Sequence, residues 1–170
     1  MDYVHIEDTM EQAKIEYVSC IHAIQAEQGS GKKIALCHGC FDPLHIGHVY
    51  HFHEARAYAD ILVVSITSDK FILKGTGRPL FHQSQRLDMI KELKCVDYAL
   101  INIFPTAVEL INQLRPDFFI KGADYKNSRN KNFAREVNAI NGIGGQLVVT
   151  EKKWFSSTDI IDQVGFNEFR

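Results

Sequence analysis

Residues 34–48 read IALCHGCFDPLHIGH, which is an apolar run, a short turn and then a histidine-rich segment. A short apolar run is typical of a parallel strand that is covered on both faces. His45 and His48 are three residues apart, so they lie on one face if a helix begins there. This order of strand, loop and helix favours an α/β fold.

Short apolar runs alternate with helical patterns along the rest of the chain. The expected strands are 34–37, 61–66, 98–101, 118–120 and 147–149. Helices are expected at 49–59, 83–93 and 106–114, with one or two more at 3–28. Strands that alternate with helices pair in parallel through right-handed crossovers. The sequence therefore predicts a Rossmann-like, doubly wound parallel sheet with helices on both faces, plus an N-terminal helical extension.

The composition is that of an ordinary globular protein, with 170 residues, 45% hydrophobic and 24% charged. A net charge of −2 gives no basic footprint for nucleic acid or an anionic membrane. No apolar run approaches the roughly 18 residues of a membrane span, and the polar N-terminus does not resemble a signal peptide. Four cysteines in a chain of this size do not suggest a disulfide framework. We therefore expect a cytoplasmic protein that binds neither nucleic acid nor membrane.

The loop and helix after the first strand are the expected ligand site, because doubly wound sheets bind ligands beyond the carboxyl ends of their strands. A helix that starts near His45 presents free N–H groups and the positive end of its dipole, which suits an anion. Gly47 has no Cβ, so a nucleotide can lie close to the backbone. An attacking phosphate monoester is already largely ionised at neutral pH and needs no base. The two imidazoles are thus expected to stabilise charge on a phosphate during transfer.

The string GCFDPLHIGH resembles the G-x-F-D-x-x-H-x-G-H signature of the cytidylyltransferase-like nucleotidyltransferases. The resemblance covers about residues 33–165. It continues through the pairs Ser68-Asp69, Lys74-Gly75, Arg78-Pro79, Gln85-Arg86 and Val96-Asp97 and through IKGADY and FSSTDI. RPLFHQSQR and IKGADY look most like the adenylyltransferase that activates heptose 1-phosphate. Glycerol-3-phosphate and phosphocholine cytidylyltransferases look similar but more distant.

The resemblance implies transfer of a nucleoside monophosphate from ATP or CTP to a phosphorylated metabolite, with release of pyrophosphate. It favours a sugar 1-phosphate as the acceptor and places ATP slightly ahead of CTP. It also implies a nucleotide that enters as its Mg²⁺ complex, held mainly by phosphate oxygens rather than by a metal site of the protein. A homodimer is expected. The implied domains are an N-terminal helical extension (1–32), the nucleotidyltransferase domain (33–165) and a C-terminal tail (166–170).

The resemblance also assigns roles to individual residues. Catalytic roles fall to His45, His48, Lys74 and Arg86. Nucleotide binding is expected of Gly39, Cys40, Phe41, Asp42, Gly47, Lys121, Gly122, Asp124, Tyr125, Ser156, Ser157 and Thr158. The acceptor is expected to contact Asp69 and Arg78.

Several other interpretations stay open at this stage. A cytidylyltransferase that acts on glycerol, choline or another alcohol phosphate is the main alternative, and Phe41, Phe71 and Phe81 could form an aromatic cage for choline. A non-catalytic nucleotide-binding protein is a more remote one. Cys37 and Cys40 have C-x-x-C spacing beside several histidines, which admits a zinc site, although the spacing from Cys40 to His45 is too short for a structural zinc finger.

Overall fold

The computed structural model describes residues 4–73, 75, 77–151 and 161, with side chains from residue 11 onward. Its centre is one parallel sheet of five strands in the order β3-β2-β1-β4-β5. The strands are β1 Ile34–Gly39, β2 Ile61–Thr67, β3 Tyr98–Asn102, β4 Phe118–Lys121 and β5 Gln146–Val149. All five lie where the apolar runs predicted them, so the predicted fold class is confirmed.

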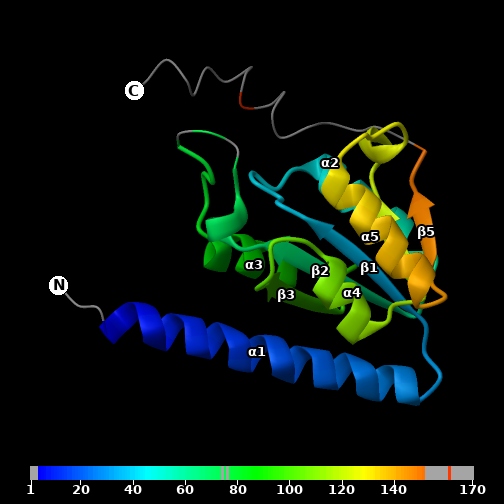
Figure 1. Cartoon of the computed structure of the whole chain (residues 1–170), viewed down its shortest axis with the longest axis horizontal. Coiled ribbons are helices and arrows are strands. Elements are labelled where there is room, and N and C mark those ends of the chain that lie inside the picture. Colours follow the sequence, from blue (N-terminus) through cyan, green and yellow to red (C-terminus); the bar gives the residue numbers. More distant parts are fainter. Residues whose placement is uncertain (1–3, 74, 76, 152–160, 162–170) are drawn as a thin grey trace.

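Helices cover both faces of the sheet (Figure 1). On one face, α2 and α3 pack against the sheet through buried residues such as Phe52 and Ile90. On the other face, α1, α4 and α5 enclose a second core that includes Ile24, Leu110 and Ile140. The bounds are α1 Val4–Gly29, α2 Ile46–Arg56, α3 Gln83–Lys91, α4 Val108–Leu114 and α5 Lys131–Gly142, with short 3₁₀ turns η1 Asp69–Phe71 and η2 Ala123–Tyr125.

Strand β1 lies in the middle of the sheet, where the chain order changes direction. It pairs with β2 on one side and with β4 on the other, so Cys37 lies opposite both Val64 and Ile120. The carboxyl ends of β1 and β4 therefore diverge into loops on opposite faces of the sheet. This topological switch point is where open α/β sheets bind their ligands.

Helix α1 packs on the sheet as an integral part of the core. Tyr17, Ile21 and Ile24 are all buried against α4 and β3. The hydroxyl of Tyr17 donates to the side chain of Gln113 at 2.8 Å. The predicted domain boundary at residue 32 stays a prediction, but this packing makes the helix a cover for one face of the sheet (Figure 1).

Helix α5 is an element that we did not predict from the sequence. The side chain of Asn130 caps it by accepting the N–H groups of Asn132 and Phe133 at 2.8 and 3.3 Å. Its buried positions are Phe133, Glu136 and Ile140, and the apolar residues Phe133, Val137 and Ile140 recur at helical spacing, so the pattern for this helix is present in the sequence. None of the helices in the described part of the chain is long and apolar enough to cross a bilayer.

Candidate active site

The two histidines of the first loop cap helix α2 with their own side chains. His45 is the N-cap, and its Nδ1 accepts the N–H of Gly47 at 3.1 Å. The N–H of His45 in turn donates to Nδ1 of His48 at 3.3 Å. The two rings are stacked, with centroids 3.8 Å apart and planes 26° from parallel. The pair thus forms a capping box built from imidazoles instead of a hydroxyl and a carboxylate.

This capping arrangement fixes the protonation of both rings. A ring nitrogen that accepts a backbone N–H carries no proton, so the proton of each neutral imidazole must be on Nε2. Burial lowers the pKa of His45 below its usual value, which favours the neutral ring at pH 7. Nε2 of His45 is buried and has no hydrogen-bond partner among the described residues. A phosphate oxygen in contact with this donor would remove the cost of leaving it unpaired.

Gly39 and Phe41 shape the loop that delivers the histidines. Phe41 has a φ of 51°, in the left-handed region that side chains rarely adopt, and its ring packs edge-on against His48 with centroids 5.1 Å apart. A Cβ on Gly39 would lie 2.9 Å from this ring, so a larger residue there would force the ring to shift. The predicted nucleotide contacts of Gly39 and Phe41 stay predictions. In the structure, the ring of Phe41 packs against His48, and the absence of a side chain at Gly39 leaves room for that ring.

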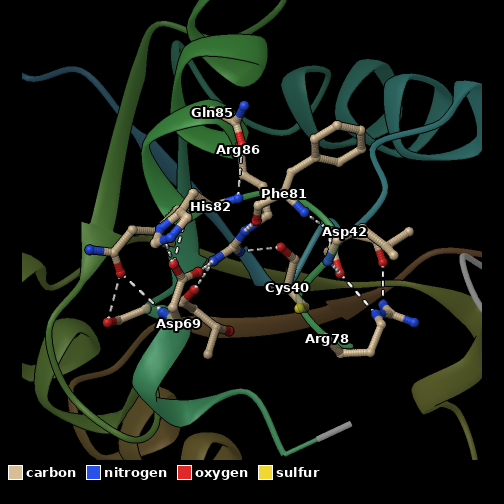
Figure 2. A network of polar contacts seen from close by, with 12 residues as sticks. Cys40, Asp42, Asp69, Arg78, Phe81, His82, Gln85 and Arg86 are labelled. Carbon is tan, nitrogen blue, oxygen red and sulfur yellow. Dashed lines mark hydrogen bonds and ion pairs between the residues drawn. The ribbon is translucent and has the colours of Figure 1, made fainter. Parts of the chain in front are cut away.

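Arg86 is the centre of a buried polar network behind this loop (Figure 2). Its side chain is fully buried, and its guanidinium donates to three backbone carbonyls and one carboxylate. The acceptors are the carbonyls of Cys40 (2.6 Å), Thr67 (2.8 Å) and Phe81 (3.0 Å) and Oδ1 of Asp69 (2.6 Å). These bonds engage four of the five N–H donors of an arginine. The predicted catalytic role of Arg86 stays a prediction, and this geometry favours a positioning role.

Asp42 and Arg78 form a second ion pair in the same network, with Nε and Oδ2 2.9 Å apart (Figure 2). The buried carboxylate of Asp42 also accepts the N–H groups of Leu80 and Phe81 at 2.8 and 3.0 Å. Arg78 donates a further bond to the carbonyl of Asp42. Residues 78–81 are therefore fastened to the loop that carries the histidines.

Asp69 has protein partners on both of its carboxylate oxygens. Besides Arg86, it contacts Nδ1 of His82 at 2.8 Å and accepts the N–H of Gln83 at 3.0 Å. Its side chain retains 23% exposure. The predicted acceptor contacts of Asp69 and Arg78 stay predictions, and both carboxylate–arginine pairs act in this structure to join the ends of β1 and β2 to α3.

A cavity of about 270 Å³ opens at the carboxyl ends of the strands, beside the histidine loop. It shares Gly39 and Cys40 with that loop. Its walls come from the ends of β1, β2 and β4, the β3–α4 connection and the N-terminal half of α5. Its lining includes His38, Thr67, Phe71, Thr106, Lys121, Tyr125, Asn130, Asn132, Phe133 and Glu136. Of the residues that line the cavity, Gly39, Cys40, Lys121 and Tyr125 were predicted site residues.

A buried ion pair forms one wall of this cavity. Nζ of Lys121 lies 3.1 Å from Oε2 of Glu136, and the two residues are 3% and 5% exposed. The ammonium also donates to the carbonyl of His38 at 3.2 Å and lies 4.7 Å from the ring centroid of Tyr125. The other oxygen of Glu136 accepts the N–H of Ala107 at 3.1 Å. Each charge is thus compensated and held in one orientation.

Two titratable side chains next to this ion pair have shifted pKa values. Burial and the nearby carboxylates of Asp124 and Glu136 raise the pKa of Tyr125 to about 12. Burial and the charge of Lys121 lower the pKa of His38 to about 3, and its Nδ1 lies 2.7 Å from the hydroxyl of Ser65. Both groups are therefore neutral at pH 7, so they add hydrogen-bonding capacity to this region without adding charge.

Gly122 and Asp124 adopt a tight turn after β4. A Cβ on Gly122 would lie 2.7 Å from a carboxylate oxygen of Asp124, so glycine permits this close approach. Nucleotide binding by both residues stays a prediction. The predictions for Lys74, Ser156, Ser157 and Thr158 lie outside the described residues.

The C-x-x-C spacing does not mark a favourable zinc site in this geometry. Cys37 is fully buried in the sheet, and burial strongly raises the pKa of its thiol, whereas zinc binds the thiolate. Its sulfur contacts Nε2 of His51 at 3.5 Å. Among the described residues, no group of three or more His, Cys, Asp or Glu side chains could hold a metal ion.

Comparison with known proteins identifies the family. A family model described as "Cytidylyltransferase-like" matches residues 36–163, which include the histidine loop, the cavity and every strand after the start of β1. The chain belongs to the cytidylyltransferase-like family. The resemblance recognised in the histidine signature is thereby confirmed.

Curated relatives and a solved structure agree with this family. The chain is 38% identical over 144 residues to the "Bifunctional protein HldE" of Geobacter metallireducens, which covers 83% of this chain and 29% of that protein. It is 37% identical over 156 residues to the protein of the same name from Geotalea uraniireducens, which covers 89% of this chain and 31% of that protein. The chain thus spans about a third of the length of these relatives.

The solved structure that it resembles is a lipopolysaccharide core biosynthesis protein from Thermoplasma volcanium. The TM-score is 0.58 at 25% identity, and the match covers 74% of this chain and 99% of that one. The Rossmann-like fold of this cytidylyltransferase-like chain is therefore shared with a solved relative.

Proposed function

We propose that this chain is a nucleotidyltransferase that transfers a nucleoside monophosphate from ATP, or less readily from CTP, to a sugar 1-phosphate. The observation that carries the proposal is the pair of imidazoles at the start of α2. Each accepts a backbone N–H on Nδ1, so the proton of each neutral ring lies on Nε2. The loop that carries them also lines, through Gly39 and Cys40, a polar cavity at the carboxyl edge of the sheet. Two fixed donors at a helix N-terminus are suited to a phosphate that gains charge.

In the proposed reaction, a phosphate oxygen of the acceptor attacks the α-phosphorus of the nucleotide. The bond from that phosphorus to the bridging oxygen of the β-phosphate breaks, and pyrophosphate leaves with the electron pair. The acceptor phosphate is already ionised, so no side chain has to remove a proton. Nε2–H of His45 and of His48 would donate to the oxygens of the α-phosphate, where charge accumulates in the transition state.

A polyhydroxy acceptor is supported over a cationic one by the groups around the cavity. The three phenylalanines considered for a choline cage are not brought together. Phe71 lines the cavity, Phe41 is buried against Phe52, and Phe81 does not line the cavity. The ammonium of Lys121 already lies over the ring of Tyr125, so a quaternary ammonium there would meet a like charge.

The relatives fit a sugar acceptor. The structural neighbour is named as a lipopolysaccharide core biosynthesis protein, and lipopolysaccharide cores are built from sugars. Mg²⁺ would enter with the triphosphate and be held mainly by phosphate oxygens. When bound, it would neutralise charge on the β- and γ-phosphates.

The test is a pyrophosphate-release screen of the purified chain with the four NTPs against a panel of phosphorylated acceptors. The panel should contain several sugar 1-phosphates, glycerol 3-phosphate and phosphocholine. We expect turnover with a sugar 1-phosphate and a preference for ATP. Turnover of only glycerol or choline phosphate with CTP would refute the proposed acceptor but keep the reaction class. No pyrophosphate release with any pair would refute the proposed activity.

A further inference from the structure

The cavity contains a set of polar groups that the transfer chemistry does not use. Thr106, Asn132 and Glu136 line it, and none of them belongs to the loop that carries the histidines. Asn132 is exposed on the first turn of α5. The cavity reaches the histidine loop at Gly39 and Cys40, so these groups could contact the part of the acceptor that does not react.

The charge of this wall is balanced. Lys121 and Glu136 compensate one another at 3.1 Å, and the neighbouring His38 and Tyr125 are neutral at pH 7. A second ionised group on the acceptor would find no unpaired opposite charge here, and it would lose its hydration on entry. A neutral hydroxyl would instead find two strong partners, because it can donate to the carboxylate and accept from the ammonium.

Glu136 is held in place independently of any ligand. Its Oε1 accepts the N–H of Ala107, and its Oε2 contacts Lys121. A charged group whose orientation is already fixed loses little entropy when it binds a hydroxyl. Both residues line the cavity. The Glu136 side chain remains 7% exposed and the Lys121 side chain 4%.

We propose that this cavity binds the hydroxyl-bearing ring of the acceptor and that Glu136, paired with Lys121, makes it selective for rings without a further charge. The inference rests on the proposed function and deepens it. An unmodified hexose or heptose 1-phosphate should therefore be accepted, whereas a ring that carries an amino or a carboxylate group should be rejected. Glu136 is a specificity-determining residue in this account and takes no part in bond breaking.

Glu136→Gln tests the proposal because glutamine keeps the shape and can still accept the N–H of Ala107. The loss of a charged hydrogen-bond acceptor should raise the KM for a neutral sugar 1-phosphate by about 10- to 100-fold. The kcat at saturating acceptor and the KM for the nucleotide should stay within about threefold. The cavity wall would then carry a net positive charge, so the KM for a uronic acid 1-phosphate should fall relative to the KM for the neutral sugar 1-phosphate. A purely structural role for Glu136 would not produce that reversal.

Asn132→Ala is the second variant, because Asn132 is exposed and its truncation should not disturb folding. We expect its acceptor KM to rise by about 3- to 10-fold, the effect of one neutral hydrogen bond. Glu92→Gln and Asn138→Ala are matched controls at exposed positions that do not line the cavity. They should leave all constants unchanged.

The outcomes separate this inference from the proposed function. If the unmodified chain uses a neutral sugar 1-phosphate but both variants keep its acceptor KM, the inference is wrong and the proposed function stands. Equal use of amino, carboxylate and neutral sugar phosphates by the unmodified chain would also overturn it. If Glu136→Gln does not fold, Asn132→Ala decides alone, since an unchanged acceptor KM refutes the inference and a selective rise supports it. If the unmodified chain uses no sugar phosphate, the proposed acceptor fails and the inference fails with it.

Discussion

Replacing Arg86 with methionine should destabilise the protein strongly, because its guanidinium joins three segments of the site. The change keeps most of the volume but removes the donors to the carbonyls of Cys40, Thr67 and Phe81 and leaves Asp69 without its arginine. Breaking a buried ion pair by removing one partner costs about 3–5 kcal/mol. Asp69 is 23% exposed and can regain some hydration, so we expect the lower part of that range, about 3–4 kcal/mol.

Thermal unfolding by circular dichroism measures this effect. In a chain of this size, about 1 kcal/mol corresponds to about 2–4 °C, so Tm should fall by about 6–16 °C. Arg135→Met, at an exposed position of α5, is the matched control and should change Tm by no more than about 2 °C. Arg86→Lys should recover part of the stability, because a lysine can keep the charge near Asp69 but cannot reach all three carbonyls. If Arg86→Met kept its Tm while nucleotide binding was lost, the guanidinium would serve the ligand and the structural reasoning would be wrong.

Four further predictions concern the histidines, acid stability, metal and assembly. His45→Asn keeps an oxygen that can cap α2 but removes the Nε2–H donor, so kcat should fall by about 10²–10³ while Tm changes little; near-normal turnover would exclude the assigned role. The pKa of His38 is lowered to about 3 and that of His51 to about 4, chiefly by burial. Below about pH 6.5 the unfolded chain therefore binds more protons than the folded chain. As the pH falls from there towards the folded pKa of each histidine, that histidine should reduce the unfolding free energy by about 1.4 kcal/mol per pH unit. Urea unfolding at pH 7 and pH 5.5 checks this, and equal stability at both would contradict it. EDTA should abolish pyrophosphate release and Mg²⁺ should restore it, whereas a requirement for bound zinc in folding would revive the C-x-x-C interpretation. Light scattering at micromolar concentration should show a homodimer. We expect the two copies to meet at α2 and residues 78–86, where Ile46 is 50% and Phe81 38% exposed. Ile46→Asp should therefore produce monomers.

Local sequence patterns were sufficient for most of the fold. All five strands were predicted to within about two residues because each is a short apolar run between turn signals. Helix α5 was missed although Phe133, Val137 and Ile140 recur at helical spacing, so the local pattern was sufficient to predict it. What the sequence could not show is that Glu136, on the buried side of this helix, has its partner in Lys121, fifteen residues earlier in the chain.

The candidate site, like the fold, was predicted from the sequence only in part. The sequence by itself determined the family, the histidine pair and the edge of the sheet where the pair lies, since these depend on residues that are neighbours in the chain. Only the tertiary structure decided that Arg86 pairs with Asp69 and Arg78 with Asp42. It alone also decided that Lys121 and Glu136 share a cavity wall. The physical reason is that the partner of a buried charge is set by how strands and helices pack together. Chain order does not report which charges that packing brings within hydrogen-bonding distance.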